Sequence, residues 1–281
     1  TLGTAILSGI LSSVVNRSNE TINENAKLSK FIACVLQPKS AERIRNDLGP
    51  SLSKYVNIVQ SDQNYNAIAA AKYVILACKP YMVEEILTRP GIEDVCGGKV
   101  FISVCAGVST KQIHDYLPSL PLCTVVRAMP NTASQIHESM TVIESPHPPL
   151  NADLTSSITW IFSQIGSVTH LPSYQMSNAT ALCGSGPAFF ALVLEAAIDG
   201  AVAMGLARHE AVRMAAQTMK GTAELVLQGE HPALLKDKVT SPGGCTIRAL
   251  SVLEEGGVRG YMAKAIREAA IIAGTLGKPM Q

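Results

Sequence analysis

The feature that most constrains the fold is a regular alternation of short apolar runs with helical patterns in the first half of the chain. The runs are rich in Val and Ile and are continuous: Phe31–Leu36, Val56–Val59, Tyr73–Cys78, Val100–Val104, Thr124–Arg127 and Met140–Ile143. Continuous runs of this length are typical of strands buried on both faces of a parallel sheet. Helical patterns lie between them, at Ala5–Val14, Ser40–Asp47, Asn66–Ala71, Val83–Leu87 and Ser109–Tyr116. This order predicts a doubly wound, Rossmann-like α/β domain.

The second half of the chain has a different character. The proline-rich segment 145–153 is predicted to be a loop, followed by a helix at Leu154–Ile165 and a strand at Ser167–Leu171. From Gly184 onward almost every pattern is helical, so we predict an α/β domain at 1–172 and an all-α domain at 173–281. Small residues on several helix faces favour an intertwined oligomer, although a monomeric bundle fits too: Ala196, Ala197, Gly200, Ala201 and Ala203.

Composition excludes several classes of protein. The 281 residues carry 23 Lys+Arg and 22 Asp+Glu without a long basic tract, which argues against a nucleic-acid partner. No uninterrupted apolar run approaches the roughly 18 residues that span a bilayer, and no secretory signal is apparent. The seven cysteines are odd in number and form no C-x-x-C, which indicates reduced thiols and no metal site. We expect a cytoplasmic protein without a membrane partner.

The chain starts with a helical pattern, whereas a doubly wound sheet normally places a strand before its first helix. We therefore expect that the first strand is missing. If that strand ended in G-x-G, Gly3 would be the third glycine of a G-x-G-x-x-G dinucleotide loop, at a helix N-terminus facing a pyrophosphate. Taken alone, Gly3 is explained better by an ordinary structural glycine.

Loops that follow the predicted strands hold candidate cofactor residues. The second strand is followed by Gln37, Lys39 and Ser40 and by no acidic residue, which suits a ribose 2′-phosphate or, with equal weight, a solvated loop. Three further loops end parallel strands: Ala77-Cys78-Lys79-Pro80, Val104-Cys105-Ala106-Gly107 and Ala128-Met129-Pro130-Asn131-Thr132. Loops at the carboxyl edge of such a sheet form the crevice in which ligands bind.

The segment Ser241-Pro242-Gly243-Gly244-Cys245-Thr246 precedes a helical pattern in the second half. Two adjacent glycines allow successive backbone N–H groups to converge, and the helix start adds a positive dipole end, so the segment suits a carboxylate. The Thr246 hydroxyl can donate or accept a hydrogen bond. A loop with an N-cap explains the same pattern without a function.

The ordered set of motifs resembles that of pyrroline-5-carboxylate reductases over essentially the whole chain. The motifs that carry the resemblance are V-T-S-P-G-G-C-T-I at Val239–Ile247, L-x-x-L-E at Leu250–Glu254, G-S-G-P-A at Gly184–Ala188, A-M-G-L-A-R at Ala203–Arg208, H-P-A-L-L-K-D at His231–Asp237, A-C-K-P at Ala77–Pro80, C-A-G at Cys105–Gly107 and R-A-M-P-N-T at Arg127–Thr132. The resemblance implies reduction of 1-pyrroline-5-carboxylate to L-proline with NADPH or NADH. It also implies a helical domain that interlocks two subunits, with the active site near their interface.

The resemblance assigns residues to both ligands. The substrate residues would be Ser241, Gly243, Gly244, Cys245 and Thr246, with Thr246 facing the ring nitrogen and Lys238 lining the same site. The implied cofactor contacts are Thr1, Leu2, Gly3, Gln37, Asn64, Ala77, Cys78, Lys79, Pro80, Val104, Cys105 and Ala106, to which the strand-end loops add Lys39, Ser40 and Asn131.

No His, Asp or Glu in these motifs is an obvious general acid, so proximity and orientation of the two reactants would carry most of the catalysis. Two other hypotheses remain open. The chain could be a related dehydrogenase acting on another imine or a β-hydroxyacid, although such enzymes use a helical-domain lysine that has no clear equivalent here. It could also be a non-enzymatic dinucleotide-binding or scaffold protein.

Overall fold

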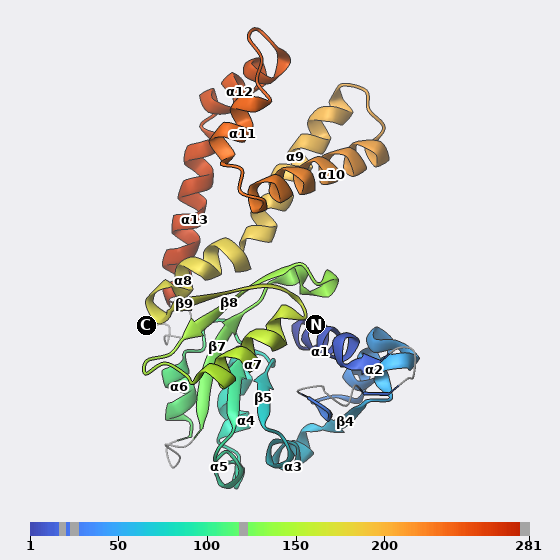
Figure 1. Ribbon diagram of the computed structural model, residues 1–281, viewed down its shortest axis with the longest axis vertical. Helices are drawn as coiled ribbons and strands as arrows, with labels where there is room; N and C mark the ends of the chain where they lie inside the picture. The colour runs from blue at the N-terminus through green and yellow to red at the C-terminus, as the bar shows by residue number, and fades with distance from the viewer. Residues whose placement is uncertain (17–20, 23–27, 118–122, 276–281) are drawn as a thin grey trace. The chain divides into compact units, whose positions relative to one another are not determined.

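The computed structural model describes residues 1–16, 21–22, 28–117 and 123–275. The chain divides into two compact units, Thr1–Gly184 with Ala270–Gln281, and Ser185–Ala269 (Figure 1). The first unit extends past the predicted boundary at Pro172 because Met176 and Ala179 pack against Met129 and Val142 of the sheet.

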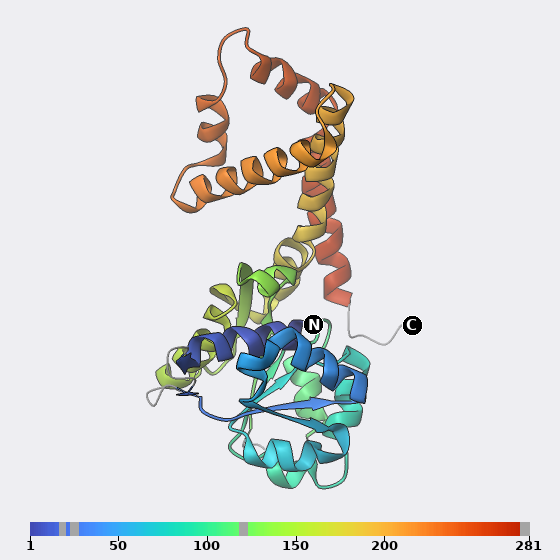
Figure 2. The ribbon, with the colours of Figure 1, turned by 90° about the vertical axis from the view of Figure 1, so that its right-hand side faces the viewer.

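The first unit contains two separate ladders of long strands (Figure 2). In the smaller sheet, β3 (Phe31–Val35) pairs in parallel with β4 (Val56–Gln60). The larger sheet has the order β5-β6-β7-β8-β9. Its strands are β5 (Tyr73–Leu76), β6 (Val100–Ser103), β7 (Thr124–Met129), β8 (Ser139–Ser145) and β9 (Gly166–Pro172). Two short strands, β1 (Val15–Asn16) and β2 (Thr21–Ile22), form an antiparallel pair of their own.

Helices cover both faces of the sheets, as the continuous apolar runs predict. Neighbouring residues of one strand enter different cores: Ile102 joins the core under α1 and α7, while Phe101 joins the core under α4 and α6. Both side chains are fully buried. The helices of this unit are α1 (Leu2–Val14), α2 (Pro38–Ser53), α3 (Asn64–Ala70), α4 (Val83–Leu87), α5 (Ile92–Val95), α6 (Thr110–Asp115), α7 (Ala152–Ser163) and α8 (Met176–Ala179).

The sheet departs from a fully parallel one at its far side. Strand β8 runs antiparallel to β7, and β9 is parallel to β8. Strands β5, β6 and β7 are parallel neighbours, so the loops at their carboxyl ends share one edge of the sheet. That edge is the place where ligands of doubly wound sheets bind.

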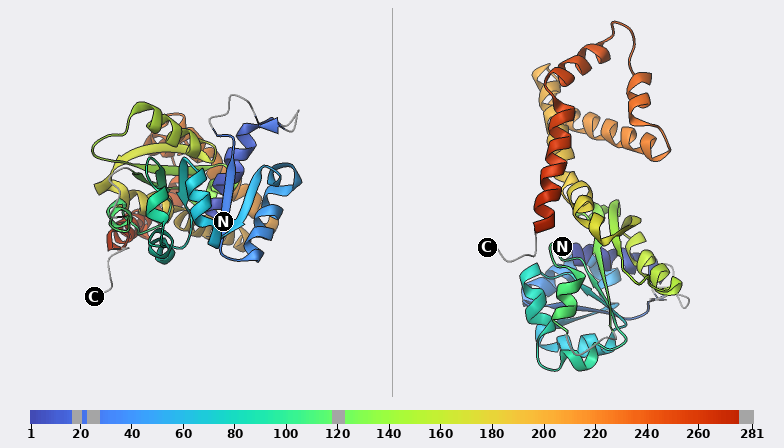
Figure 3. Two further views of the ribbon diagram at one scale, coloured as in Figure 1. Left: turned by 90° about the horizontal axis from the view of Figure 1, so that it is seen from below. Right: turned by 90° about the vertical axis from the view of Figure 1, so that its left-hand side faces the viewer.

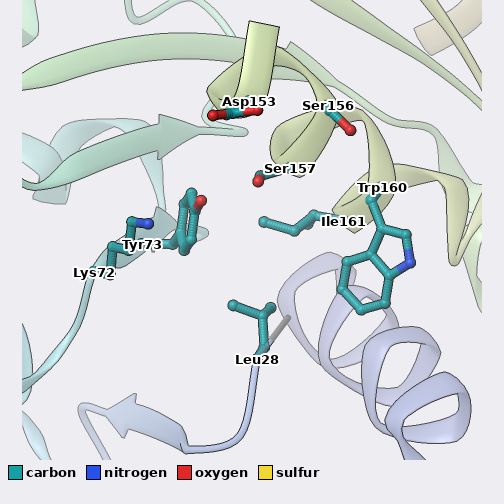
Figure 4. Close-up of a pocket in the computed structure, with 8 residues that line it drawn as sticks. All are labelled: Leu28, Lys72, Tyr73, Asp153, Ser156, Ser157, Trp160 and Ile161. Atoms are coloured by element: carbon teal, nitrogen blue, oxygen red, sulfur yellow. The ribbon is translucent and has the colours of Figure 1, made fainter. Parts of the chain in front are cut away.

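Among the described residues, no strand joins β3 to β5. In a doubly wound sheet this position belongs to the strand that comes before the first helix. A hollow of about 330 Å³ opens beside these strands, walled by Leu28 before β3 and Tyr73 in β5 (Figure 4). Residues of α7 complete the wall, among them Asp153 and Trp160. The hollow adjoins the amino end of β5, so it lies away from the ligand edge.

The second unit is entirely helical. It contains α9 (Gly186–Ala203), α10 (Arg208–Leu227), α11 (Pro232–Lys238), α12 (Cys245–Glu255) and most of α13 (Val258–Thr275), seen from two further directions in Figure 3. Among its described residues only Gly186, Ile198 and Ala211 are buried. Many large apolar side chains are exposed instead, namely Phe190, Leu192, Val193, Val212, Met214, Val252, Leu253 and Tyr261.

One helical run, Ser173–Ala203, is long and apolar enough to cross a membrane by length and composition alone. The run is not an uninterrupted apolar stretch in the sequence, because Glu195 and Asp199 lie within it. Helices in the cores of soluble proteins pass the same test, so this finding is weak evidence for a membrane segment.

Candidate functional site

The start of α1 lies directly against the end of β5. Thr1 caps the helix, and its hydroxyl accepts a hydrogen bond from the Thr4 backbone at 3.3 Å. A Cβ atom placed on Gly3 would lie 2.9 Å from the Ala77 Cβ, closer than such atoms approach. The absence of a side chain at Gly3 therefore permits this close packing. This is the role expected of the third glycine in a dinucleotide loop.

Four predicted cofactor residues follow the strands of the smaller sheet. Gln37 is the N-cap of α2, where its side chain makes no capping bond and is exposed. Lys39 and Ser40 occupy the first turn of the same helix, and that turn contains no acidic residue. Asn64, at the start of α3, is buried, and its side-chain oxygen has no hydrogen-bond partner among the described residues. A buried acceptor without a partner is costly, so a ligand with hydroxyl or amino donors fits this position.

The loops after β5 and β6 are joined through sulfur. The Cys105 thiol donates to the carbonyl of Leu76 at 3.2 Å and to that of Cys78 at 3.4 Å. The neighbouring Cys105 side chain lowers the pKa of the Cys78 thiol. The Cys78 side chain, together with burial, raises the pKa of Cys105. Lys79 and Ala106 beside them are exposed at the same edge, and Pro80 opens a short 3-10 helix.

Asn131 follows β7, and its side chain is engaged within the protein. Its oxygen accepts from the Ala133 backbone at 3.0 Å, and its nitrogen donates to the Cys183 carbonyl at 3.1 Å. Its backbone N–H donates to the Ser139 hydroxyl at 3.0 Å. Asn131 therefore holds the strand-end loop in place, and a contact between its side chain and a cofactor stays a prediction.

The double-glycine segment has the backbone shape of an anion-binding turn. Gly243 has a φ of +70°, a conformation that favours glycine, and Gly244 is the N-cap of α12. A Cβ on Gly244 would lie 3.2 Å from the Ser241 carbonyl oxygen and closer still to the Ser241 hydroxyl. The positive φ favours glycine at 243, and a side chain at 244 would crowd Ser241. The Gly244 N–H donates to the Ser241 carbonyl at 3.1 Å, and the following amide groups in the first turn of α12 are open to a ligand.

Thr246 and Lys238 differ in how their polar groups are used. Thr246 lies in the first turn of α12, half-buried, and its hydroxyl has no hydrogen-bond partner among the described residues. The exposed Lys238 amine instead donates to both carboxylate oxygens of Glu230, one of them at 2.6 Å. Thr246 is therefore the freer of the two to meet a substrate.

The structure groups the predicted residues by ligand. All of the predicted cofactor residues belong to the first unit, and all of the predicted substrate residues belong to the second. Sequence reasoning missed two buried serines that support the cofactor loops. Ser103 accepts from the Cys105 backbone at 3.3 Å, and Ser139 accepts from Asn131. A single serine in an apolar strand carries no pattern that would have revealed either role.

Comparisons with known proteins match both units. A model described as pyrroline-5-carboxylate reductase dimerisation matches residues 173–276, and one described as NADP oxidoreductase, coenzyme F420-dependent, matches residues 3–107. A pyrroline-5-carboxylate reductase from Lophium arboricola is 59% identical over 100% of this chain and 92% of its own length. The chain belongs to the pyrroline-5-carboxylate reductase family. A reductase of the same name from Neurospora crassa is 48% identical over 99% of this chain and 90% of its own length.

Solved reductase structures confirm the predicted fold class. A pyrroline-5-carboxylate reductase from Coxiella burnetii has a TM-score of 0.81 at 26% identity and covers 99% of this chain, with 95% of its own length covered. A pyrroline carboxylate reductase from Plasmodium falciparum, solved with NADP bound, has a TM-score of 0.78 at 25% identity over the same shares of the two chains. A Rossmann-like domain followed by a helical dimerisation domain is thus the architecture of this family member.

Proposed function

We propose that this chain reduces 1-pyrroline-5-carboxylate to L-proline, with NADPH as the hydride donor. The observation that carries the proposal is the pairing of two sites on one chain. A dinucleotide edge with a close Gly3–Ala77 contact lies in the first unit, and a double-glycine anion turn at the start of α12 lies in the second. The bound dinucleotide would supply a hydride from its nicotinamide ring.

Residues of the first unit would hold the dinucleotide. The N-terminus of α1 suits the pyrophosphate of the dinucleotide. The buried Asn64 side-chain oxygen would accept a hydrogen bond from a donor group in the adenosine half of the dinucleotide. Gln37, Lys39 and Ser40 offer amide, cationic and hydroxyl groups at the place where an NAD site normally has a carboxylate. This combination supports NADPH over NADH, a preference that parallel titrations with the two nucleotides would test.

Residues of the second unit would hold the imine. The backbone amides of Gly243 and Cys245 would bind the substrate carboxylate and fix the ring, while the Gly244 N–H donates to the Ser241 carbonyl at 3.1 Å. The Thr246 hydroxyl would hold a proton at the ring nitrogen, because an iminium carbon accepts a hydride far more readily than a neutral imine. A hydroxyl is a weak acid, so orientation of the two reactants would supply most of the acceleration.

The two sites must meet for hydride transfer. We propose that they do so near a subunit interface in a homo-oligomer, with the exposed apolar side chains of the second unit in the interface. The dimerisation model that matches residues 173–276 supports this arrangement. We also propose a cytoplasmic location, which the seven free thiols support.

The function is tested by following NADPH oxidation with 1-pyrroline-5-carboxylate as the acceptor. For Thr246→Ala we expect turnover to fall roughly ten- to a hundredfold or more, as on loss of a proton-handling group. Thr246→Ser keeps the hydroxyl and should retain most of the activity.

Ser251→Ala is the matched control, because Ser251 lies on the same helix with its hydroxyl bonded to the Ile247 carbonyl at 3.1 Å. Its kinetics should be unchanged. If the wild type oxidises NADPH and the Thr246→Ala variant does so at the same rate, Thr246 has no part in the mechanism. If the wild type shows no turnover, the proposed function is wrong.

A further inference from the structure

Cys78 and Cys105 face one another across neighbouring parallel strands. The register of β5 with β6 pairs Leu76 with Ser103, and the ladder continues through a bond of 3.0 Å from the Val104 N–H to the Leu76 carbonyl. Two residues further along each strand, the same register brings Cys78 beside Cys105. Neighbouring strands lie about 4.8 Å apart, which falls within the Cα separation of disulfides, about 4.4–6.8 Å.

We propose that Cys78 and Cys105 form a reversible disulfide whose formation weakens dinucleotide binding. The pair lies in the two strand-end loops of the predicted cofactor edge, so the inference rests in part on the proposed function. Both thiols are free in the structure, and the Cys105 sulfur already lies 3.4 Å from the Cys78 carbonyl oxygen, to which it donates.

The environments of the two thiols assign their roles. Cys78 is partly exposed, and the neighbouring Cys105 side chain lowers its pKa, which increases the fraction of thiolate at a given pH. Cys105 is only 3% exposed, and its pKa is raised by the Cys78 side chain and by burial. Cys78 is therefore the attacking sulfur and Cys105 the resolving one.

The chemistry balances with hydrogen peroxide as the oxidant. The Cys78 thiolate attacks one peroxide oxygen, the O–O bond breaks, and hydroxide leaves and takes up a proton to give water. The Cys105 sulfur then attacks the Cys78 sulfenic acid and expels a second water. Two thiols lose two hydrogen atoms, and the peroxide is reduced to two waters. A small dithiol reverses the bond by exchange.

The disulfide would act on the edge through hydrogen bonds. The Cys105 S–H donates to the carbonyls of Leu76 and Cys78, and oxidation removes this donor. The disulfide also links the loop at 77–80 covalently to the loop at 104–107. Since both loops are predicted to contact the dinucleotide, we expect roughly tenfold weaker NADPH binding, the effect of losing about one good contact.

Cys96 and Cys123 provide an internal control. They lie close enough to interact electrostatically, but both are buried. Burial raises the pKa of Cys96 to about 11 and also raises that of Cys123. Neither sulfur is activated, so this pair should stay reduced under conditions that oxidise Cys78 and Cys105.

The test treats the reduced full chain with dilute hydrogen peroxide, blocks the remaining thiols and maps the peptides by mass spectrometry. We expect a Cys78–Cys105 cross-link that dithiothreitol reverses, and a parallel loss and recovery of NADPH binding. In Cys105→Ser, dimedone should trap a sulfenic acid on Cys78, whereas Cys78→Ser should show no such label on Cys105.

A Cys96–Cys123 cross-link, or separate alkylation of Cys78 and Cys105 after peroxide, would overturn the proposal. Unchanged NADPH affinity in the cross-linked protein would also contradict it. Turnover of 1-pyrroline-5-carboxylate by the reduced protein is measured separately, so a failure of the proposed function would not be confused with a failure of the disulfide.

Discussion

At the scale of single residues, Gly3 permits the close packing of α1 against the loop that follows β5. The Cβ of a Gly3→Ala variant would lie 2.9 Å from the Ala77 Cβ, and the Ala77 Cβ cannot move without the backbone. The start of α1 must then shift away from β5, so we expect NADPH to bind at least about tenfold more weakly. Fluorescence titration with NADPH measures the effect.

Gly97→Ala is the control for this variant, since nothing lies within 4 Å of a Cβ at Gly97. Its NADPH affinity should equal that of the wild type. Equal affinity in Gly3→Ala as well would mean that α1 does not approach β5 in solution as closely as described.

Single residues also show where sequence reasoning succeeds and where it stops. The need for glycine at 243 and 244 follows from a turn into a helix, and the positive φ of Gly243 agrees with it. The two hydrogen bonds of the Asn131 side chain could not be foreseen, because the Cys183 carbonyl that it binds is 52 residues away. The sequence likewise brings Cys78 and Cys105 to one sheet edge, while the sulfur contact requires the strand register.

At the scale of elements, α1 depends on close contact with the end of α7. A Cβ on Gly9 would lie 2.6 Å from the Gln164 carbonyl oxygen and 2.7 Å from a methyl carbon of Ile165. We therefore expect Gly9→Ala to lower the free energy of unfolding by about 1–3 kcal/mol through overpacking. Urea denaturation followed by circular dichroism measures this loss.

Ser13→Ala changes an exposed position of the same helix and should leave stability nearly unchanged. A Gly9→Ala protein as stable as this control would show that α1 and α7 can separate without cost.

The predicted elements agree closely with those observed, and the differences have local causes. The helix predicted at Ser40–Asp47 continues as α2 to Ser53, across a kink at Gly49, whose φ is +68°, and Pro50. The antiparallel entry of β8 was not foreseen, because strand direction depends on the loop that joins β7 to β8 and not on the apolar pattern. Alternation of apolar runs fixes which segments are strands but leaves their pairing open.

At the scale of the whole molecule, the helical unit exposes more apolar surface than a folded monomer can easily tolerate in water. Leu192 on α9 is 66% exposed. If a second copy covers it, a glutamate there would remove about 1.5–3 kcal/mol of burial. We thus expect Leu192→Glu to weaken self-association at least about tenfold in sedimentation velocity.

The matched control is Ile136→Glu, which places the same charge at an exposed apolar position of the first unit. Its sedimentation should follow that of the wild type. A wild-type chain that stays monomeric at every concentration would contradict the interface directly.

If the dinucleotide binds as proposed, it contacts strand-end loops of both ladders, on either side of the division between β3 and β5 among the described residues. Residues proposed to bind it follow β3 and β4 on one side of the division, at Gln37 and Asn64, and β5 on the other, at Ala77. Because such a ligand binds the folded chain and not the unfolded one, it would stabilise the native state. At a hundred times its dissociation constant, it would add about 2.7 kcal/mol to the native state. The reductant would then stabilise the folded protein in addition to supplying the hydride.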